Sequence, residues 1–173
     1  MKRKVVVITT GGTIEKIYDE DSGTLSNRGS HLRQMLKRLR LPYTHVEHHD
    51  LMSKDSLDMT EEDRKKLVAT VEKLLNTVPI IILHGTDTMQ VTAERLYETF
   101  ADLSAPIILT GAMKPFGFED SDALQNFTEA LIASELVKPG VYITMHGKIH
   151  VMPGVRKNRQ HRTFEKSDDP LQD

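Results

Sequence analysis

Three stretches of the sequence place threonine and glycine directly after a run of apolar residues. They are Thr10-Gly11-Gly12-Thr13, Gly85-Thr86-Asp87-Thr88 and Thr110-Gly111. A threonine hydroxyl becomes a nucleophile when a neighbouring base takes its proton. A carboxylate beside it, as at position 87, can hold an amino group. Three such stretches that converge in space would form a pocket rich in hydroxyl groups.

Each of these side chains also has a simpler structural interpretation. Threonine is a favoured N-cap residue, so Thr13 and Thr86, taken singly, are more often helix caps than nucleophiles. Asp87 stands where a helix should begin, and a carboxylate there complements the helix dipole. The base that a hydroxyl needs could be Lys157, although it lies in a basic run of the kind that usually forms a solvated surface.

The elements that must hold these residues alternate between strand and helix. Unbroken apolar runs predict strands buried on both faces over residues 4–10, 80–83, 106–109 and 141–145. Two further strands are expected over residues 44–50 and 149–152. Helical spacing of apolar residues predicts four helices. The first follows Ser30, the second begins at a capping box of Thr60 and Asp63, the third follows Thr88, and the fourth follows Asp120 or Ser121.

This alternation predicts an α/β fold in which helices cover both faces of a mainly parallel sheet. We expect a three-layer, doubly wound, Rossmann- or flavodoxin-like arrangement, in one domain over residues 1–173. Open sheets of this kind bind ligands beyond the carboxyl ends of their strands. Residues 14–29 read as a long loop without regular structure, as lids and binding loops often do, and no element is predicted over residues 153–173.

Composition argues against several other classes of protein. A chain of 173 residues with 38% hydrophobic and 28% charged residues is ordinary for a soluble globular domain. The net charge of -2 gives no reason to expect nucleic acid or an anionic membrane as a partner, and no stretch is long enough to span a bilayer. The absence of cysteine excludes a disulfide framework and a thiol nucleophile, and it fits a cytoplasmic protein.

Metal and nucleotide cofactors are not expected either. In a strand, His45 and His49 would share a face while His48 points away, and no acidic partner is well placed to complete a metal site. The first turn lacks the glycine pattern of a dinucleotide site, and no phosphate-binding loop motif occurs anywhere in the chain.

Four motifs in order along the chain resemble the bacterial-type L-asparaginases, which are threonine amidohydrolases. They are Thr10-Gly11-Gly12-Thr13-Ile14, His84-Gly85-Thr86-Asp87-Thr88-Met89, Thr110-Gly111-Ala112-Met113-Lys114-Pro115, and Lys157 shortly after Gly154-Val155. Any one motif alone would be weak, but together they are specific. The resemblance implies hydrolysis of L-asparagine to L-aspartate and ammonia through a threonyl ester, with poor activity on glutamine and no cofactor.

The resemblance also implies a role for each matching residue. Thr13 would be the nucleophile, and Thr86, Asp87 and Lys157 would form a second group that activates a hydroxyl or a water molecule; Tyr18 would belong to a lid over the substrate. The expected substrate-binding residues are Gly12, Asp55, Ser56, Leu57, Thr86, Asp87 and Ala112, with Asp87 on the α-ammonium and Ser56 on the α-carboxylate.

Three departures from the family pattern qualify this expectation. Family members are commonly about twice as long, so this chain resembles a short form without the second, C-terminal domain. Tyr18 lies closer to Thr13 than the lid tyrosine does in many members, and Leu57 stands where several have a polar residue. A symmetric homo-oligomer could shield the open site. Two alternatives stay open: an amino-acid sensor or regulatory module, and an amidohydrolase for a larger amide.

Overall fold

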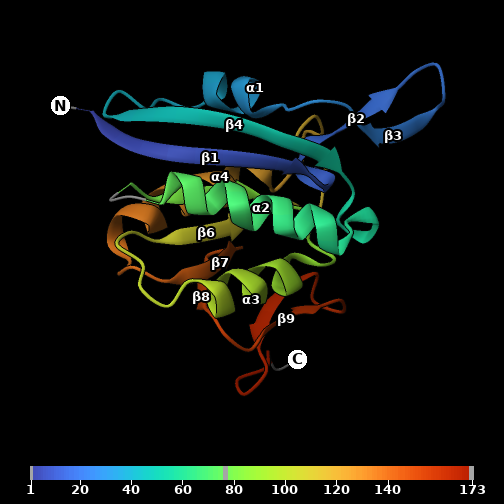
Figure 1. The fold of residues 1–173 in the computed structure, drawn as a ribbon. Helices are drawn as coiled ribbons and strands as arrows, with labels where there is room; N and C mark the ends of the chain where they lie inside the picture. The colour runs from blue at the N-terminus through green and yellow to red at the C-terminus, as the bar shows by residue number, and fades with distance from the viewer. Residues whose placement is uncertain (1, 76–77, 172–173) are drawn as a thin grey trace.

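The computed structural model of the chain describes residues 2–75 and 78–171 (Figure 1). Within these residues the central sheet contains, in spatial order, β4 (Thr44–Lys54), β1 (Arg3–Gly11), β5 (Ile80–Leu83), β6 (Ile107–Thr110), β7 (Val141–Met145) and β8 (Lys148–Val151). The strands from β4 to β7 run parallel, and β8 closes the edge antiparallel to β7.

Alternate residues of the central strands pack into two separate cores. In β5, Ile80 and Ile82 belong to the core that contains helices α2 (Glu61–Leu74) and α3 (Met89–Thr99). Ile81 and Leu83 point to the opposite core, which contains α1 (Leu32–Arg38) and α4 (Ala123–Leu136). Since successive side chains of a strand point to opposite faces, helices must cover both sides of the sheet. The predicted three-layer α/β fold is confirmed (Figure 1).

The start of α2 follows from its capping box, as predicted. The Thr60 hydroxyl accepts a hydrogen bond from the backbone N–H of Asp63 at 3.2 Å, and the Asp63 carboxylate accepts one from the N–H of Thr60 at 2.8 Å. The same carboxylate binds Lys54 at the end of β4. This contact ties the helix to the segment that leads into the predicted site.

Two hairpins lie where the sequence predicted no regular structure. One pairs β2 (Lys16–Asp19) with β3 (Thr24–Asn27), inside the expected long loop, and the other pairs β9 (Val155–Asn158) with β10 (Thr163–Lys166). Their strands have four residues each, too short to give a clear alternation in a polar sequence. Short 3-10 helices, η1 (Thr13–Glu15) and η2 (Ser56–Asp58), complete the described elements. No helix among the described residues is long and apolar enough to cross a membrane.

The strand order creates a switch point between β1 and β5. The chain leaves β1 toward β4 on one side and later returns to β5 on the other, so a crevice opens beyond the carboxyl ends of these two strands. There the two backbones touch, because a Cβ atom on Gly12 would lie 2.3 Å from the nitrogen of Gly85. A Cβ on Gly85 would in turn lie 2.6 Å from the Ser56 hydroxyl oxygen. Glycine is therefore required for the strand ends to meet.

Replacing Gly12 by alanine should separate these strand ends. Gly12 has a φ of +79°, so Gly12→Ala combines backbone strain with a steric clash, and we expect a loss of about 3 kcal/mol or more in the free energy of unfolding in urea. Gly29→Ala is the matched control, since Gly29 has a φ of +70° but open space around its Cα. It should lose only about 1–2 kcal/mol from strain. Equal losses in the two variants would show that the contact with Gly85 does not matter.

Candidate active site

A lysine, a threonine and an aspartate from distant parts of the chain meet at the switch point. Lys157 Nζ donates hydrogen bonds to Thr86 Oγ1 at 2.7 Å and to Asp87 Oδ1 at 3.0 Å. The Lys157 side chain is only 11% exposed, so these contacts lie largely out of water. A lysine in contact with both a hydroxyl and a carboxylate can pass a proton between oxygen atoms when it is in its neutral form.

The β9–β10 hairpin holds Lys157 in place. Lys157 is paired in register with the buried Phe164 on β10. On either side, Asn158 and Arg156 donate to the buried carboxylate of Glu165 at 2.8 and 2.9 Å. These hydrogen bonds, with that from Asn158 contributing most, lower the pKa of Glu165. The hairpin is thus fixed by one buried carboxylate, a role that the sequence did not reveal.

Thr13 lies directly after the contact between the two strand ends. Gly12 touches Gly85, so the next residues, Thr13 and Thr86, start from backbones that are already in contact. No described residue makes a hydrogen bond to the Thr13 hydroxyl in the structure. The residue is half-buried, and its hydroxyl keeps its hydrogen-bonding capacity for a bound molecule.

A buried carboxylate supports the turn that carries Thr13. Glu15 accepts hydrogen bonds from the Gly11 N–H at 3.1 Å, the Ser30 hydroxyl at 2.6 Å and the His31 N–H at 3.2 Å. Burial outweighs these bonds and raises the pKa of Glu15 from 4.5 to about 7. No pattern in the sequence pointed to Glu15, because its partners come from a different element.

Ser56 and Asp55 lie on the side of the crevice that β4 delivers. Buried Ser56 packs under Gly85, and its hydroxyl accepts a hydrogen bond from the Thr88 N–H at 3.3 Å. Asp55 forms an ion pair with Lys16 at 2.6 Å. Desolvation raises the pKa of Asp55, but the hydrogen bond from Lys16 and the charge of Lys157 outweigh it, so the pKa is lowered overall. Asp55 is therefore close enough to Lys157 for the two charges to interact.

The remaining predicted residues, Ala112, Leu57 and Tyr18, differ in burial. Ala112 is fully buried in the turn after β6. Leu57 is exposed on η2, and the Tyr18 side chain is 62% exposed on the β2–β3 hairpin, which projects from the body of the molecule (Figure 1). The structure therefore brings Gly12, Thr86, Asp87, Lys157 and Ser56 together and leaves Tyr18 outside this group. A lid role for Tyr18 stays a prediction.

Two further polar residues fix the turns around the site. Buried His84 donates from Nδ1 to the Gly85 carbonyl at 2.8 Å, so its Nε2 is left to accept from the Thr92 hydroxyl. Burial lowers the pKa of His84 to about 4, which keeps the ring neutral. Asp122 accepts from the N–H groups of Met113 and Lys114, which orders the turn after β6. The sequence placed helix-capping residues near position 122 but did not predict this contact.

Asp87 has a second cationic partner. Arg159 Nη1 lies 3.0 Å from Asp87 Oδ1, the same atom that Lys157 contacts. The Arg159 side chain is 72% exposed, so this second ion pair lies at the solvent side of the site. The sequence suggested only a solvated basic surface for this residue, because Asp87 is 72 positions away along the chain.

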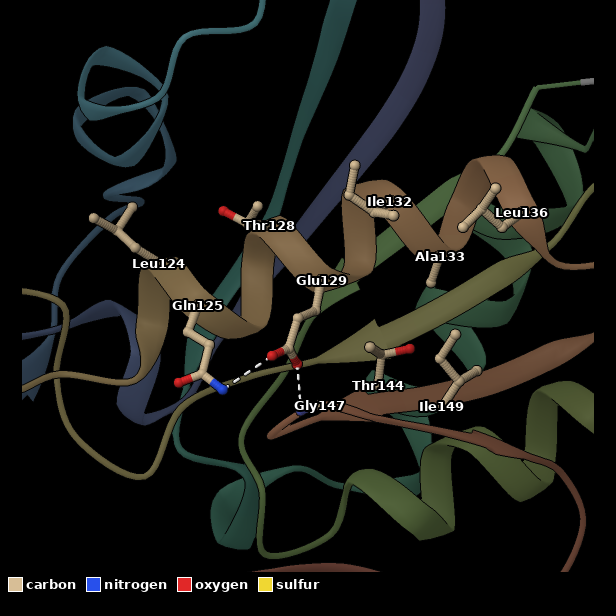
Figure 2. A pocket seen from close by; sticks show the side chains of 10 residues that line it. All are labelled: Leu124, Gln125, Thr128, Glu129, Ile132, Ala133, Leu136, Thr144, Gly147 and Ile149. Atoms are coloured by element: carbon tan, nitrogen blue, oxygen red, sulfur yellow. Dashed lines mark hydrogen bonds between the residues drawn. The ribbon is translucent and has the colours of Figure 1, made fainter.

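A separate groove lies on the far edge of the sheet, between α4 and the β7–β8 hairpin (Figure 2). Its lining is mostly apolar and includes Ile132 and Leu136 from α4 and Ile149 from β8. Its carboxylate, Glu129, accepts hydrogen bonds from Gln125 and from the Gly147 N–H. Since the described residues that line this groove include no nucleophile paired with a base, we place the candidate active site at the switch point instead.

Comparison with known proteins finds similarity over nearly the whole of this chain. Residues 4–170 match the family model described as Asparaginase, N-terminal. Over 159 residues the chain is 30% identical to an L-asparaginase of Thermococcus kodakarensis, covering 91% of this chain and 48% of the relative. Over 150 residues it is 31% identical to one of the subunits of the glutamyl-tRNA(Gln) amidotransferase of Methanosphaera stadtmanae, covering 84% of this chain and 34% of the relative.

A solved structure is also similar to nearly the whole of this chain. The thermostable L-asparaginase from Thermococcus kodakarensis aligns with a TM-score of 0.87 at 28% identity, over 96% of this chain and 52% of that protein. The chain therefore spans about half the length, or less, of the relatives that it matches.

The buried Glu15 predicts a pH dependence of stability. The folded protein keeps a proton on Glu15 up to a higher pH than the unfolded chain does, so this stabilisation is full below about pH 4.5 and is lost as the pH rises through about 7. Glu15→Gln removes it. The unfolding free energy of the wild type, minus that of the variant, should fall by about 1 kcal/mol per pH unit between these limits in urea titrations. A difference that does not vary with pH would contradict the shifted pKa.

Proposed function

This chain belongs to the asparaginase family, and we propose that it hydrolyses the side-chain amide of L-asparagine to L-aspartate and ammonia. The observation that carries the proposal is the contact of Lys157 with Thr86 and Asp87, together with the unpaired hydroxyl of Thr13 in the turn that touches Gly85. A binding protein would need the carboxylate and the neutral donors. It would have no use for a largely buried lysine on a threonine hydroxyl, which suits proton transfer.

The proposed reaction proceeds through an ester. The Thr13 oxygen attacks the amide carbon while its proton passes to a base; the carbon–nitrogen bond then breaks, and the nitrogen leaves as ammonia after taking up a proton. Water next attacks the ester, which releases aspartate and restores the hydroxyl. Lys157 and Thr86 would serve the proton transfers, and Asp87 would keep Lys157 oriented.

Substrate recognition in this proposal uses the side chains around the crevice. Ser56 lies beneath Gly85 and would contact the α-carboxylate. Asp55, which forms an ion pair with Lys16, would add a negative charge on the same side of the crevice. Gly12 and Ala112 would line the space for the short side chain. Leu57 offers no hydrogen bond, so we expect glutamine to be a poor substrate. A cytoplasmic location is part of the proposal, since a chain without cysteine is compatible with a reducing compartment.

We further propose that the protein forms a homo-oligomer through the groove of Figure 2. Leu136 on α4 is 74% exposed, and Ile132 and Ile149 beside it are also exposed. The groove adjoins β8, whose outer edge has no partner strand among the described residues. An apolar groove beside a free strand edge is the kind of surface that a second, symmetry-related copy can cover.

Replacing Thr13 tests the enzymatic proposal. Thr13→Ala should lower kcat for ammonia release from L-asparagine by about 10³-fold or more, because the covalent route is lost. Thr13→Ser, which keeps a hydroxyl, should retain measurable turnover. Thermal unfolding checks that both variants fold. Full activity in Thr13→Ala would refute the proposed nucleophile, and calorimetric binding of L-asparagine without ammonia release in the wild type would instead indicate a sensor.

Sedimentation tests the proposed assembly. The wild type should sediment as a dimer or larger, and Leu136→Glu should shift it toward the monomer, since a charge in the covered groove disfavours association. Tyr43→Glu is the control, because Tyr43 is also strongly exposed but lies next to β4 at the opposite edge of the sheet. A wild type that sediments only as a monomer would refute the proposal.

A further inference from the structure

Asp87, the carboxylate expected to bind a substrate ammonium, is already paired with two cations. Lys157 Nζ and Arg159 Nη1 each lie 3.0 Å from its Oδ1 atom. Lys157 belongs to the proposed proton-transfer group, whereas Arg159 has no part in that chemistry. Its guanidinium already offsets the negative charge that a free α-ammonium group would pair with.

The side chains ion-paired around Asp87 and Asp55 carry one more formal positive charge than negative charge. Asp87 and Asp55 supply two negative charges, while Lys16, Lys157 and Arg159 supply three positive ones. A substrate that brings an α-ammonium would add a fourth cation to this group, and like charges at these distances repel. A substrate that brings a carboxylate and a neutral nitrogen would balance the charge.

The segment that carries Arg159 is built to hold its place. Next to it, the Asn158 side chain donates to Glu165 and accepts a hydrogen bond from the His161 N–H at 3.0 Å. These contacts fix the turn between β9 and β10, and Arg159 extends from this turn onto Asp87. Asp87 Oδ2 accepts no hydrogen bond from the described residues, so it is open to a neutral N–H donor.

From these contacts we infer that Arg159 is a specificity-determining residue, which directs the site toward asparagine whose α-nitrogen is acylated and uncharged. This inference rests on the proposed amide hydrolysis and names its substrate class. The acyl N–H would donate to Asp87 while Arg159 stays paired, and the free α-carboxylate would meet the excess positive charge. Because the Arg159 side chain is 72% exposed, the site is open on that side, and an acyl group can extend into solvent.

The test compares two substrates in matched variants. Ammonia release from L-asparagine and from N-acetyl-L-asparagine is measured in the wild type, in Arg159→Gln and in Arg159→Lys. The control is Arg162→Gln, since Arg162 is exposed in the same turn and Asp87 pairs with Lys157 and Arg159 instead. We expect the wild type to have the lower KM for the acetylated compound. Arg159→Gln should lower KM for L-asparagine by about two- to fivefold, with kcat nearly unchanged, as the loss of one exposed ion pair predicts.

Arg159→Lys should keep the preference of the wild type, because it keeps the charge, and Arg162→Gln should leave both substrates unaffected. A merely structural role for Arg159 would change kcat or stability for both substrates alike, without changing their ratio of KM values. Equal KM values in the wild type, or a ratio that Arg159→Gln leaves unchanged, would overturn the inference.

Binding measurements separate this inference from the proposed function. L-Aspartate and N-acetyl-L-aspartate, which are the products of the two amides, are titrated calorimetrically into the wild type and Arg159→Gln. If the wild type released no ammonia from either amide, the proposed function would fail, yet tighter binding of N-acetyl-L-aspartate that Arg159→Gln abolishes would still support the role of Arg159. Binding of L-aspartate as tight as that of its acetylated form, or no binding of either, would overturn it.

Discussion

The contact between the backbones of Gly12 and Gly85 is the constraint on which the rest of the site depends. Parallel strands lie nearly 5 Å apart, so residues beyond their ends meet only if the turns bend toward each other without side chains between them. Gly12 and Gly85 allow this, and Ser56 fills the space beneath Gly85. The backbones that lead into Thr13 and Thr86 meet beyond the strand ends because the glycines before these threonines have no Cβ atom.

The lysine of the site is supplied by an element outside the central sheet. The strands of the parallel sheet lead into Thr13, Ser56 and Thr86, but Lys157, the proposed base, comes from the β9–β10 hairpin, outside the sheet. The hairpin has little core of its own and relies on buried Phe164 and on Glu165, which binds the two neighbours of Lys157. The position of Lys157 is therefore set by a few polar contacts and one aromatic ring.

The sequence predicts those features that a local pattern determines. The unbroken apolar run of β5 identified a strand buried on both faces, and Thr60 with Asp63 indicated the start of α2. It could not predict contacts between residues far apart in the chain that follow no periodicity. Glu15 with Ser30 and Arg159 with Asp87 are of this kind. The two hairpins were missed because four-residue polar strands are stabilised by their tertiary contacts and not by their own propensity.

Perturbed pKa values in this domain identify supporting groups more than the proposed reacting ones. Glu15 and His84 have strongly shifted pKa values, yet each is committed to the turns that hold the threonines. Glu15 is a buried acceptor for three donors, and His84 bridges a backbone carbonyl to a helix hydroxyl. Bringing strand ends together buries the polar groups of their turns, and these groups must find hydrogen-bond partners. The shifts are thus a consequence of the same close approach that makes the site possible, and geometry, not titration, distinguishes the residues placed to meet a substrate.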